Sequence, residues 1–228
     1  TEAEHQRRDE ATARARALHP AREWETNERT LSMKNRLKAT LLVAALGVAL
    51  ASSAALAATL NVPGTYADIP TAIGAASPGD VILVAPGTSV VPATINVTVA
   101  SLTIQGSGVG LTTLQVAFAV GNLFHITASG VTIRDFTIQK TDVTGEHNLI
   151  WIQAPNATIR DNEIFGPDPG TPWGGVGGNG IVSRAMVVSN GSDGLLIQGN
   201  NIHHLRQPAY FSGTNGLPSG NITGNNVS

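Results

Sequence analysis

The chain has 228 residues, a formal net charge of −2 and no cysteine, so disulfides and thiolate metal sites are excluded. Residues 58–228 carry nine acidic and five basic side chains, a net charge of −4. This balance argues against nucleic acid as a partner, because phosphate binding needs a basic stripe. This part, about 170 residues long, is large enough to bury a hydrophobic core.

Residues 1–32 are polar, carry charges of mixed sign and do not begin with Met. They precede a segment with the features of a signal peptide, which must lie at the N-terminus to function. We therefore expect residues 1–32 to be a mistranslated upstream segment rather than part of the mature protein. A nucleic-acid-binding arm is the weaker interpretation, because mixed charges are typical of a solvated helical or disordered leader.

Residues 33–57 have the three parts of a Sec signal peptide. Met33 is followed by three positive residues, by an apolar run over 41–50, and by a small-x-small cleavage pattern that ends at Ala57. An anchoring transmembrane helix needs about 20 apolar residues, and this run is shorter. We expect cleavage after Ala57 and a secreted protein, either extracellular, periplasmic or at the cell surface, with no membrane association after cleavage.

The next segment predicts a strand, a short helix and a second strand. Residues 59–62 and 81–84 are short apolar-rich strands. Between them, Asp68 is a candidate N-cap for a helix over 69–76 whose apolar residues share one face. A stack of coils has an open apolar end, and a helix with one apolar stripe is suited to cover it.

Two stretches in the middle of the chain repeat each other at an offset of 26 residues, NLFHITASGVTIRDFTI (122–138) and NLIWIQAPNATIRDNEI (148–164). A period of this size indicates a solenoid, in which each coil buries its apolar row only against the next coil. The core of the motif recurs with spacings of 29, 26, 38 and 25 residues between its leading isoleucines, which are Ile104, Ile133, Ile159, Ile197 and Ile222. Coils of constant size with extruded loops explain these spacings.

Three asparagines, Asn162, Asn200 and Asn225, occupy one position in successive repeats. Asparagine tolerates the left-handed conformation that a tight bend needs, and its amide can bond to the asparagine of the next coil. We expect a structural ladder. The neighbouring Arg-Asp pairs at 134–135 and 160–161 are expected to form a solvated edge, in which each ion pair contributes little.

The stretch VPGTYADIPTAIGAASPGDVILVAPGT (62–88) resembles the N-terminal cap of right-handed parallel β-helix proteins of the pectate-lyase-like superfamily, and the asparagines resemble the ladder of that superfamily. Pro70, Gly74 and Ser89 depart from the commoner residues of the cap pattern. The resemblance implies an all-β, right-handed parallel β-helix over 58–228, with a short N-terminal capping helix, in a monomer. The last repeat, 221–228, has no closing cap, so we expect the domain to be incomplete at its C-terminus.

In this superfamily, the sheet built from the first strands of successive coils carries the substrate groove. The repeat register places these strands at 122–128, 148–154, 184–190 and 208–213. Alternation along the strands turns one set of side chains inward, Phe124, Ile126, Ile150 and Ile152, and a second set outward, His125, Trp151 and Gln153. An outward tryptophan has no evident structural reason in a β-helix, so we predict that the outward set contacts substrate.

A long loop, 165–183, enters the same face and holds seven Gly, three Pro and Trp173. Loops longer than about 12–15 residues without structure of their own are commonly functional. Tyr210 lies on the last of the predicted first strands. Aromatic rings beside hydrogen-bonding groups suit a polysaccharide. The predicted substrate-binding residues are therefore Trp151, Gln153, Trp173, Tyr210 and His125.

Two kinds of chemistry remain open. A lyase needs a base beside a uronate carboxylate and a cation for the enolate, and His204 and Arg206 would share a face if 204–206 is extended. A hydrolase needs two carboxylates across the bond, for which Glu146 and Asp168 are the candidates. No metal site is expected, because adjacent histidines such as His203 and His204 point to opposite sides of an extended chain.

Two motifs resemble those of calcium pectate lyases but are incomplete. In 149–154, Gln153 and Ala154 stand where those enzymes have Asp and His, and Phe211 stands at the second Arg of an R-x-P-x-x-R pattern that begins at Arg206. The cofactor is thus undetermined, with calcium implied by the resemblance alone. We expect an exported polysaccharide lyase or glycoside hydrolase acting on an acidic polysaccharide, or alternatively a non-catalytic adhesin-like or periplasmic accessory protein.

Overall fold

The computed structural model describes residues 2–14, 56–116, 121–141, 147–167, 183–189, 191–213 and 219–228. The chain forms two compact units, Thr1–Ala55 and Leu56–Ser228. In the first unit, residues 2–14 form an exposed helix. The predicted signal peptide lies outside the described residues up to position 55, so the expected domain boundaries at 32 and 57 stay predictions. No helix in the described ranges is long and apolar enough to cross a membrane.

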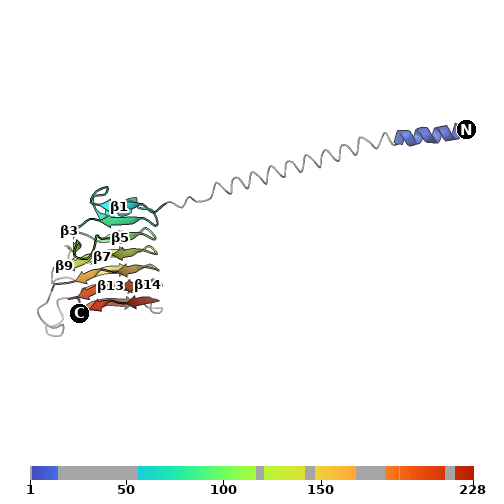
Figure 1. The fold of residues 1–228 in the computed structure, drawn as a ribbon. Helices are drawn as coiled ribbons and strands as arrows, with labels where there is room; N and C mark the ends of the chain where they lie inside the picture. The colour runs from blue at the N-terminus through green and yellow to red at the C-terminus, as the bar shows by residue number, and fades with distance from the viewer. Residues whose placement is uncertain are drawn as a thin grey trace. The chain divides into compact units, whose positions relative to one another are not determined.

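The second unit is a parallel β-helix, which confirms the predicted fold class (Figure 1). Its described strands form three sheets, and every strand pairing is parallel. Sheet A contains β1 (Thr59–Val62), β2 (Val81–Val84), β5 (Thr103–Gln105), β8 (Thr132–Arg134), β11 (Thr158–Arg160), β14 (Leu195–Gln198) and β17 (Gly220–Thr223). Sheet B contains β3 (Gly87–Val91), β6 (Thr112–Val116), β9 (Thr137–Lys140), β12 (Glu163–Phe165), β15 (Asn201–His203) and β18 (Asn226–Val227). Sheet C contains β4 (Ile95–Val97), β7 (Gly121–Ile126), β10 (His147–Ile152), β13 (Arg184–Ser189) and β16 (Gln207–Ser212).

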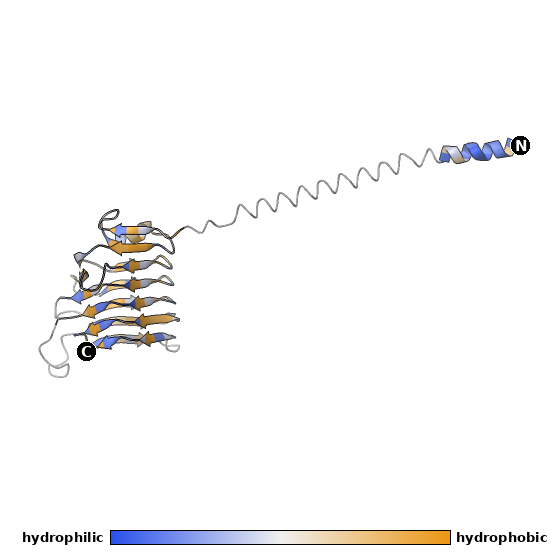
Figure 2. Ribbon diagram, in the orientation of Figure 1, coloured by the Kyte–Doolittle hydropathy of each residue, from blue (hydrophilic) through white to orange (hydrophobic). Residues whose placement is uncertain are grey.

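The core is built from rows of apolar side chains that stack in register from coil to coil (Figure 2). In sheet A the row is Ile82, Ile104, Ile133, Ile159 and Ile197, and each is at most 2% exposed. A buried isoleucine contributes about 1.5–3 kcal/mol relative to an exposed one. Each coil is too thin to bury its own row, so the row stabilises the stack and not the single coil.

A short helix covers the apolar N-terminal end of the stack. Helix α2 (Ile69–Ala75) packs against β1, β2 and β4, and Ile69, Ala72 and Ile73 are buried. The predicted N-cap is confirmed, since an Asp68 carboxylate oxygen accepts a hydrogen bond of 2.8 Å from the Thr71 backbone N–H. The pKa of Asp68 is lowered by hydrogen bonding to Thr71, first by the Thr71 side chain and second by its backbone N–H.

A second carboxylate fastens the ends of this cap. Asp80 accepts 2.8 Å hydrogen bonds from the backbone N–H groups of Ser77 and Ala58, and the same two bonds lower its pKa. A depressed pKa means that this contribution to stability is present at neutral pH and is lost as the pH falls through the folded-state value. The turn before β2 and the start of β1 are thereby joined.

At the corner between sheets A and B, the last four described coils share a tight bend of two residues, at 135–136, 161–162, 199–200 and 224–225, whereas the two coils before them use 85–86 and the longer connection 106–111. The first residue of each bend has a left-handed backbone, with φ of 63° at Asp135, 55° at Asp161, 65° at Gly199 and 63° at Gly224. The predicted ladder is confirmed, but the explanation for it was partly wrong. The left-handed residue is the one before each asparagine, and the asparagines serve by hydrogen bonding.

Asn162 shows how the ladder works. Its side-chain nitrogen donates to Asn200 Oδ1 at 3.0 Å and to the carbonyl of Ile133 at 3.1 Å. Its side-chain oxygen accepts from the backbone N–H of Phe136 at 3.1 Å. Asn200 repeats the pattern with Asn225 at 2.9 Å. Since Asn162 is 1% exposed, these bonds satisfy polar groups that water cannot reach.

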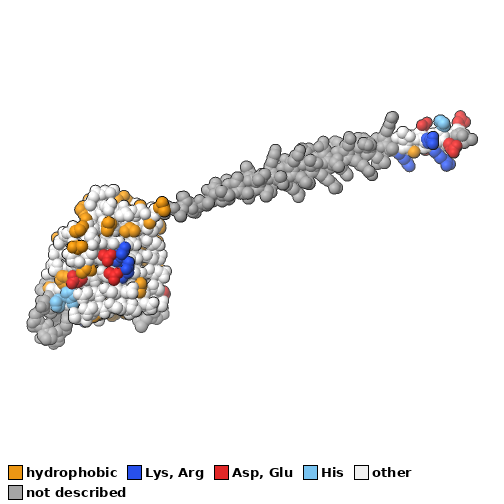
Figure 3. Space-filling view, in the orientation of Figure 1, with side chains coloured by type: hydrophobic (Ala, Val, Ile, Leu, Met, Phe, Trp, Pro, Cys, Tyr) orange, Lys and Arg blue, Asp and Glu red, His pale blue; other side chains and the backbone are white. Residues whose placement is uncertain are grey.

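The outer surface of the same corner carries two Arg-Asp pairs. Arg134 lies 3.2 Å from Asp135, and Arg160 lies 2.8 Å from Asp161, as expected from the repeat. Figure 3 shows acidic and basic side chains gathered in a small patch on the face of the β-helix toward the viewer. In the next coil the aspartate position is Gly199, where an added Cβ would lie 2.5 Å from the Asp161 carboxylate.

The corner between sheets C and A has a longer connection at 213–219 and, before it, four connections of one constant length, at 98–102, 127–131, 153–157 and 190–194. Asp193 joins the last of these to the following coil, because its carboxylate accepts hydrogen bonds of 3.0 Å from both the backbone N–H and the hydroxyl of Ser219. These bonds, the backbone one foremost, lower the pKa of Asp193.

The corner between sheets B and C is where the length of the connection varies most. The strand bounds leave 92–94, 117–120, 141–146, 166–183 and 204–206 for its connections. The coil spacing of 38 residues between Ile159 and Ile197 is therefore an insertion at this one corner. All candidate catalytic residues named above belong to these connections.

Candidate functional site

The outward face of sheet C carries one continuous row of side chains. Its members, in register from coil to coil, are Asn96, His125, Trp151, Val187 and Tyr210. The predicted inward residues of β7 and β10 are 0% exposed, which confirms the alternation. The predicted first strands are confirmed to within two residues at each end. Three of the predicted substrate-binding residues, His125, Trp151 and Tyr210, therefore share this row.

His125 and Trp151 are stacked on each other. Their ring centroids are 4.5 Å apart with an angle of 11° between the planes. His125 Nε2 lies 2.6 Å from Gln153 Oε1, and His125 Nδ1 lies 3.3 Å from Asn96 Oδ1. The indole N–H of Trp151 donates to Ser189 Oγ at 2.9 Å.

These contacts provide a structural reason for a tryptophan on the outside of the β-helix. One face of the Trp151 ring is covered by His125, and the neighbour in the row on the other side is Val187. An aromatic pair of this kind is worth about 0.5–1.5 kcal/mol beyond its buried area. Trp151 can therefore offer a ligand its exposed edge more readily than its face.

Arg184, at the start of β13, contacts side chains of the two neighbouring strands, β10 and β16. Its guanidinium carbon lies 4.8 Å from the centroid of the Tyr210 ring, and Tyr210 is 42% exposed. Its Nε donates to Gln207 Oε1 at 2.7 Å, and an Nη donates to Asn148 Oδ1 at 3.3 Å. The guanidinium is thus held from two neighbouring coils.

Arg184 was not predicted as a site residue. The signal that could have found it is the register, because Asn148, Arg184 and Gln207 occupy one position in three successive coils. The strands of sheet C contain neither Asp nor Glu, while they include His125 and Arg184. This face therefore offers amides, aromatic edges and a fixed positive charge, which suits an anionic or neutral ligand.

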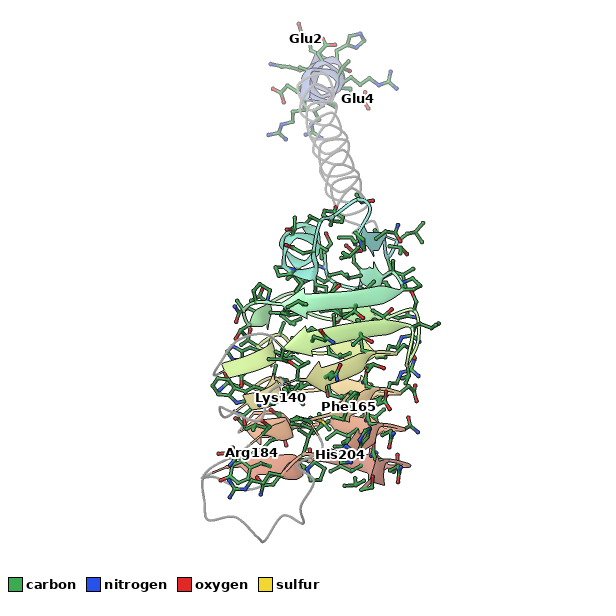
Figure 4. The ribbon with its side chains drawn as sticks, turned by 90° about the vertical axis from the view of Figure 1, so that its left-hand side faces the viewer. Glu2, Glu4, Lys140, Phe165, Arg184 and His204 are labelled. Atoms are coloured by element: carbon green, nitrogen blue, oxygen red, sulfur yellow. The ribbon has the colours of Figure 1, made fainter. Side chains whose placement is uncertain are left out.

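A second group of aromatic and imidazole rings lies on sheet B beside the variable corner. Phe165 and His203 stack with centroids 4.9 Å apart and an angle of 6°. His203 meets His204 edge to face, with the two Nδ1 atoms 3.1 Å apart. In the view of Figure 4, Phe165 lies above His204, and Lys140 lies above Arg184.

The predicted divergence of the two histidines is wrong. His204 has a left-handed backbone with φ of 54°, so the chain turns between them and brings the imidazoles together. For the same reason 204–206 is not extended, and the premise that put His204 and Arg206 on one face fails. The Arg206 side chain is exposed. Within the described ranges no hydrogen bond joins the side chains of His204 and Arg206.

Three predicted site residues, Glu146, Asp168 and Trp173, lie outside the described residues. The pairing of Glu146 with Asp168 as hydrolase carboxylates therefore stays a prediction. Within the described part of the chain, no group of three or more His, Cys, Asp or Glu side chains is arranged to hold a metal ion.

Comparison of the chain with protein-family models, with curated proteins and with solved structures finds no match.

Proposed function

We propose that this protein is an exported β-helix of the pectate-lyase-like kind that binds an acidic polysaccharide along the outward face of sheet C. The observation that carries the proposal is Arg184, a positive charge held by Gln207 and Asn148 above the Tyr210 ring, on a sheet whose strands contain neither Asp nor Glu. A guanidinium in a fixed orientation can bind a uronate carboxylate through two parallel hydrogen bonds.

The remaining row supports a long ligand rather than a small one. Successive coils repeat at about 4.8 Å along the axis of the stack, so the row presents polar and aromatic groups at regular intervals. His125, Gln153 and Asn96 form a connected group that lies two to four coils away from Tyr210. A polymer lying along the axis would meet Arg184 and this group at the same time.

For the reaction, we propose elimination beside the uronate carboxylate, with His204 as the base that takes the proton and Arg206 as the cation that stabilises the enolate. What supports this pairing is no longer a shared strand face but the short connection 204–206, which holds both residues directly before β16 of sheet C. The electron pair then expels the glycosidic oxygen and leaves an unsaturated uronate. Hydrolysis by Glu146 and Asp168 is the alternative chemistry. Calcium is implied by the superfamily resemblance alone.

A non-catalytic binding or adhesin-like role is the second candidate, and two contacts favour it. The His125–Trp151 stack and the His203–His204 pair both engage rings that an enzyme would use. A face built of such stacks is rigid, and rigidity suits binding without turnover.

The first test replaces Arg184 by Ala and measures binding to a panel of uronate and neutral polysaccharides. Losing charge-assisted hydrogen bonds of about 1.5–3 kcal/mol should weaken uronate binding about 10- to 100-fold. Arg184→Lys keeps the positive charge but cannot form two parallel hydrogen bonds to a carboxylate. Its affinity for uronate polysaccharide should therefore lie between those of the wild type and Arg184→Ala. Arg160→Ala on sheet A is the matched control and should bind normally.

Equal binding by the Arg184→Ala and Arg160→Ala variants would overturn the sheet C site. Product assays on the same panel separate the roles. Unsaturated uronate, followed by its ultraviolet absorbance, indicates a lyase, and new reducing ends without it indicate a hydrolase. Binding with neither product would support the non-catalytic role.

A further inference from the structure

The four residues Glu163, Phe165, His203 and His204 form a cluster outside the proposed polysaccharide-binding row of sheet C, although His204 is also the proposed lyase base. They come from β12, β15 and the short connection that follows β15. Sheet C carries the polysaccharide row, whereas Glu163, Phe165 and His203 point outward from sheet B. The burial of all four is intermediate, so the cluster is accessible without being loose.

The two histidine nitrogens are spaced as ligands of one metal ion. Two imidazole nitrogens that each lie about 2.0–2.1 Å from a metal are about 2.9–3.4 Å apart when the angle at the metal is about 90–109°. The two Nδ1 atoms are 3.1 Å apart. The left-handed backbone of His204 is what produces this spacing, and residues other than glycine adopt that conformation only when their surroundings hold them there.

The cluster also favours the tautomer that leaves His203 Nδ1 free for a ligand. Glu163 Oε1 lies 3.5 Å from His203 Nε2, and because a carboxylate oxygen accepts only, this contact favours a hydrogen on Nε2. Glu163 is itself oriented by Thr137, whose hydroxyl donates to Glu163 Oε2 at 3.2 Å. A carboxylate behind a ligating histidine is the arrangement that fixes ring orientation in metal sites. Phe165 stacks on the His203 ring and limits its rotation.

We propose that His203 and His204 bind one divalent transition metal ion through their two Nδ1 atoms, with Glu163 as the positioning carboxylate. Two neutral imidazoles favour Cu²⁺, Ni²⁺ or Zn²⁺ over Ca²⁺ and Mg²⁺, which prefer oxygen ligands. Since the described residues offer no third His, Cys, Asp or Glu to this pair, water completes the coordination. Such a site belongs to the corner of variable length and not to the ladder.

This site and the proposed lyase base compete for the same side chain. A metal on His204 Nδ1 leaves the hydrogen on Nε2, so metal-loaded His204 cannot accept a proton at either nitrogen. Metal should therefore inhibit elimination if His204 is the base, and it should leave polysaccharide binding on sheet C unchanged. The metal site and polysaccharide binding on sheet C can therefore each be contradicted without contradicting the other.

The test is titration of the full chain with Ni²⁺ alone by calorimetry, in parallel with two variants. His203→Ala combined with His204→Asn removes both ligands, and asparagine tolerates the left-handed backbone at 204. The wild-type chain should bind one more Ni²⁺ than this double variant. Glu163→Gln should weaken the same site about 10- to 100-fold, as loss of an outer-shell carboxylate does. His125→Ala, on sheet C, is the matched control and should bind Ni²⁺ like the wild type.

Electron paramagnetic resonance with Cu²⁺ then identifies the ligands. Hyperfine coupling to two nitrogens that is lost in the double variant supports the site, provided that the variant unfolds at the wild-type temperature in circular dichroism. Equal Ni²⁺ stoichiometry in the wild type and the double variant would overturn the proposal. The proposal would also be overturned if the Glu163→Gln variant bound Ni²⁺ as tightly as the wild type and the His125→Ala control do. The carboxylate would then have no role in positioning His203.

Discussion

The corner between sheets A and B and the corner between sheets B and C solve the same problem in different ways. From Asp135 onward the first turns the chain in two residues, and amides bond from coil to coil through Asn162, Asn200 and Asn225. The second varies from 92–94 to 166–183. The candidate catalytic residues, such as His204 and Arg206, belong to the second corner.

The difference shows where a solenoid can acquire function. A hydrogen-bonded ladder requires the same residue type and bend in each coil, so it tolerates little change. A corner without a ladder accepts insertions, because loop-closure entropy grows slowly with length. Side chains that bind or react are therefore expected at the variable corner and on the sheets next to it.

The largest expected effect tests the tight corner. Asn162→Ala removes one buried amide and leaves the Phe136 N–H, the Ile133 carbonyl and Asn200 Oδ1 each short of a partner. We expect a loss of about 3–5 kcal/mol in the free energy of unfolding, measured by urea denaturation. Asn225→Ala removes a side chain of the same ladder that is only half-buried, so it is the control and should cost less. Equal losses would mean that the ladder is not the source of stability.

A smaller effect should appear where coils touch beside the variable corner. An added Cβ at Gly166 would lie 2.5 Å from the carbonyl oxygen of His204 and 3.1 Å from Leu205 Cδ2. Because backbone must move, Gly166→Ala should cost about 1–3 kcal/mol. Gly74→Ala in α2 has nothing within 4 Å and should stabilise by about 0.4–1 kcal/mol. A lower unfolding temperature for Gly166→Ala and a higher one for Gly74→Ala, each relative to the wild type, would support this explanation. An unfolding temperature of Gly166→Ala equal to that of the wild type would contradict it.

The smallest effect concerns the charged surface of the tight corner. Arg160→Ala removes the ion pair with Asp161, whose side chain is 46% exposed. Exposed pairs are screened by water, so the change should stay below about 1 kcal/mol. Repeating the urea denaturation at high salt should abolish even this difference. A loss comparable to that of Asn162→Ala would show that the outside of the corner matters as much as its buried amides.

Most of the fold could be predicted from the sequence because aligning the repeats shows which residues pair between neighbouring coils. The offset of 26 residues aligned Ile133 with Ile159, and the structure pairs the same two residues. Alternation then assigned His125 and Trp151 to the outside. These conclusions depend on the period alone, and the period is visible in the letters.

The chemistry of the corner was harder to predict because it depends on single backbone angles. No sequence pattern predicted the left-handed backbone of His204, and this single φ angle brings the two imidazoles together. Arg184 was missed for another reason. Its partners are 36 and 23 residues away, on either side of it in the chain, and an insertion separates Arg184 from Asn148.

The contact between Asp161 and Gly199 has a consequence for anyone who would lengthen or shorten this protein. The aspartate oxygen occupies the space that a side chain would need in the following coil. Asn156 and Gly194 stand in the same relation at the next corner. Asp135 and Asp161 nevertheless occupy this position in two adjacent coils, so the residue allowed at a corner depends on its particular neighbour and not on the repeat alone. A consensus built from single repeats would average over this dependence and place two bulky residues in one space.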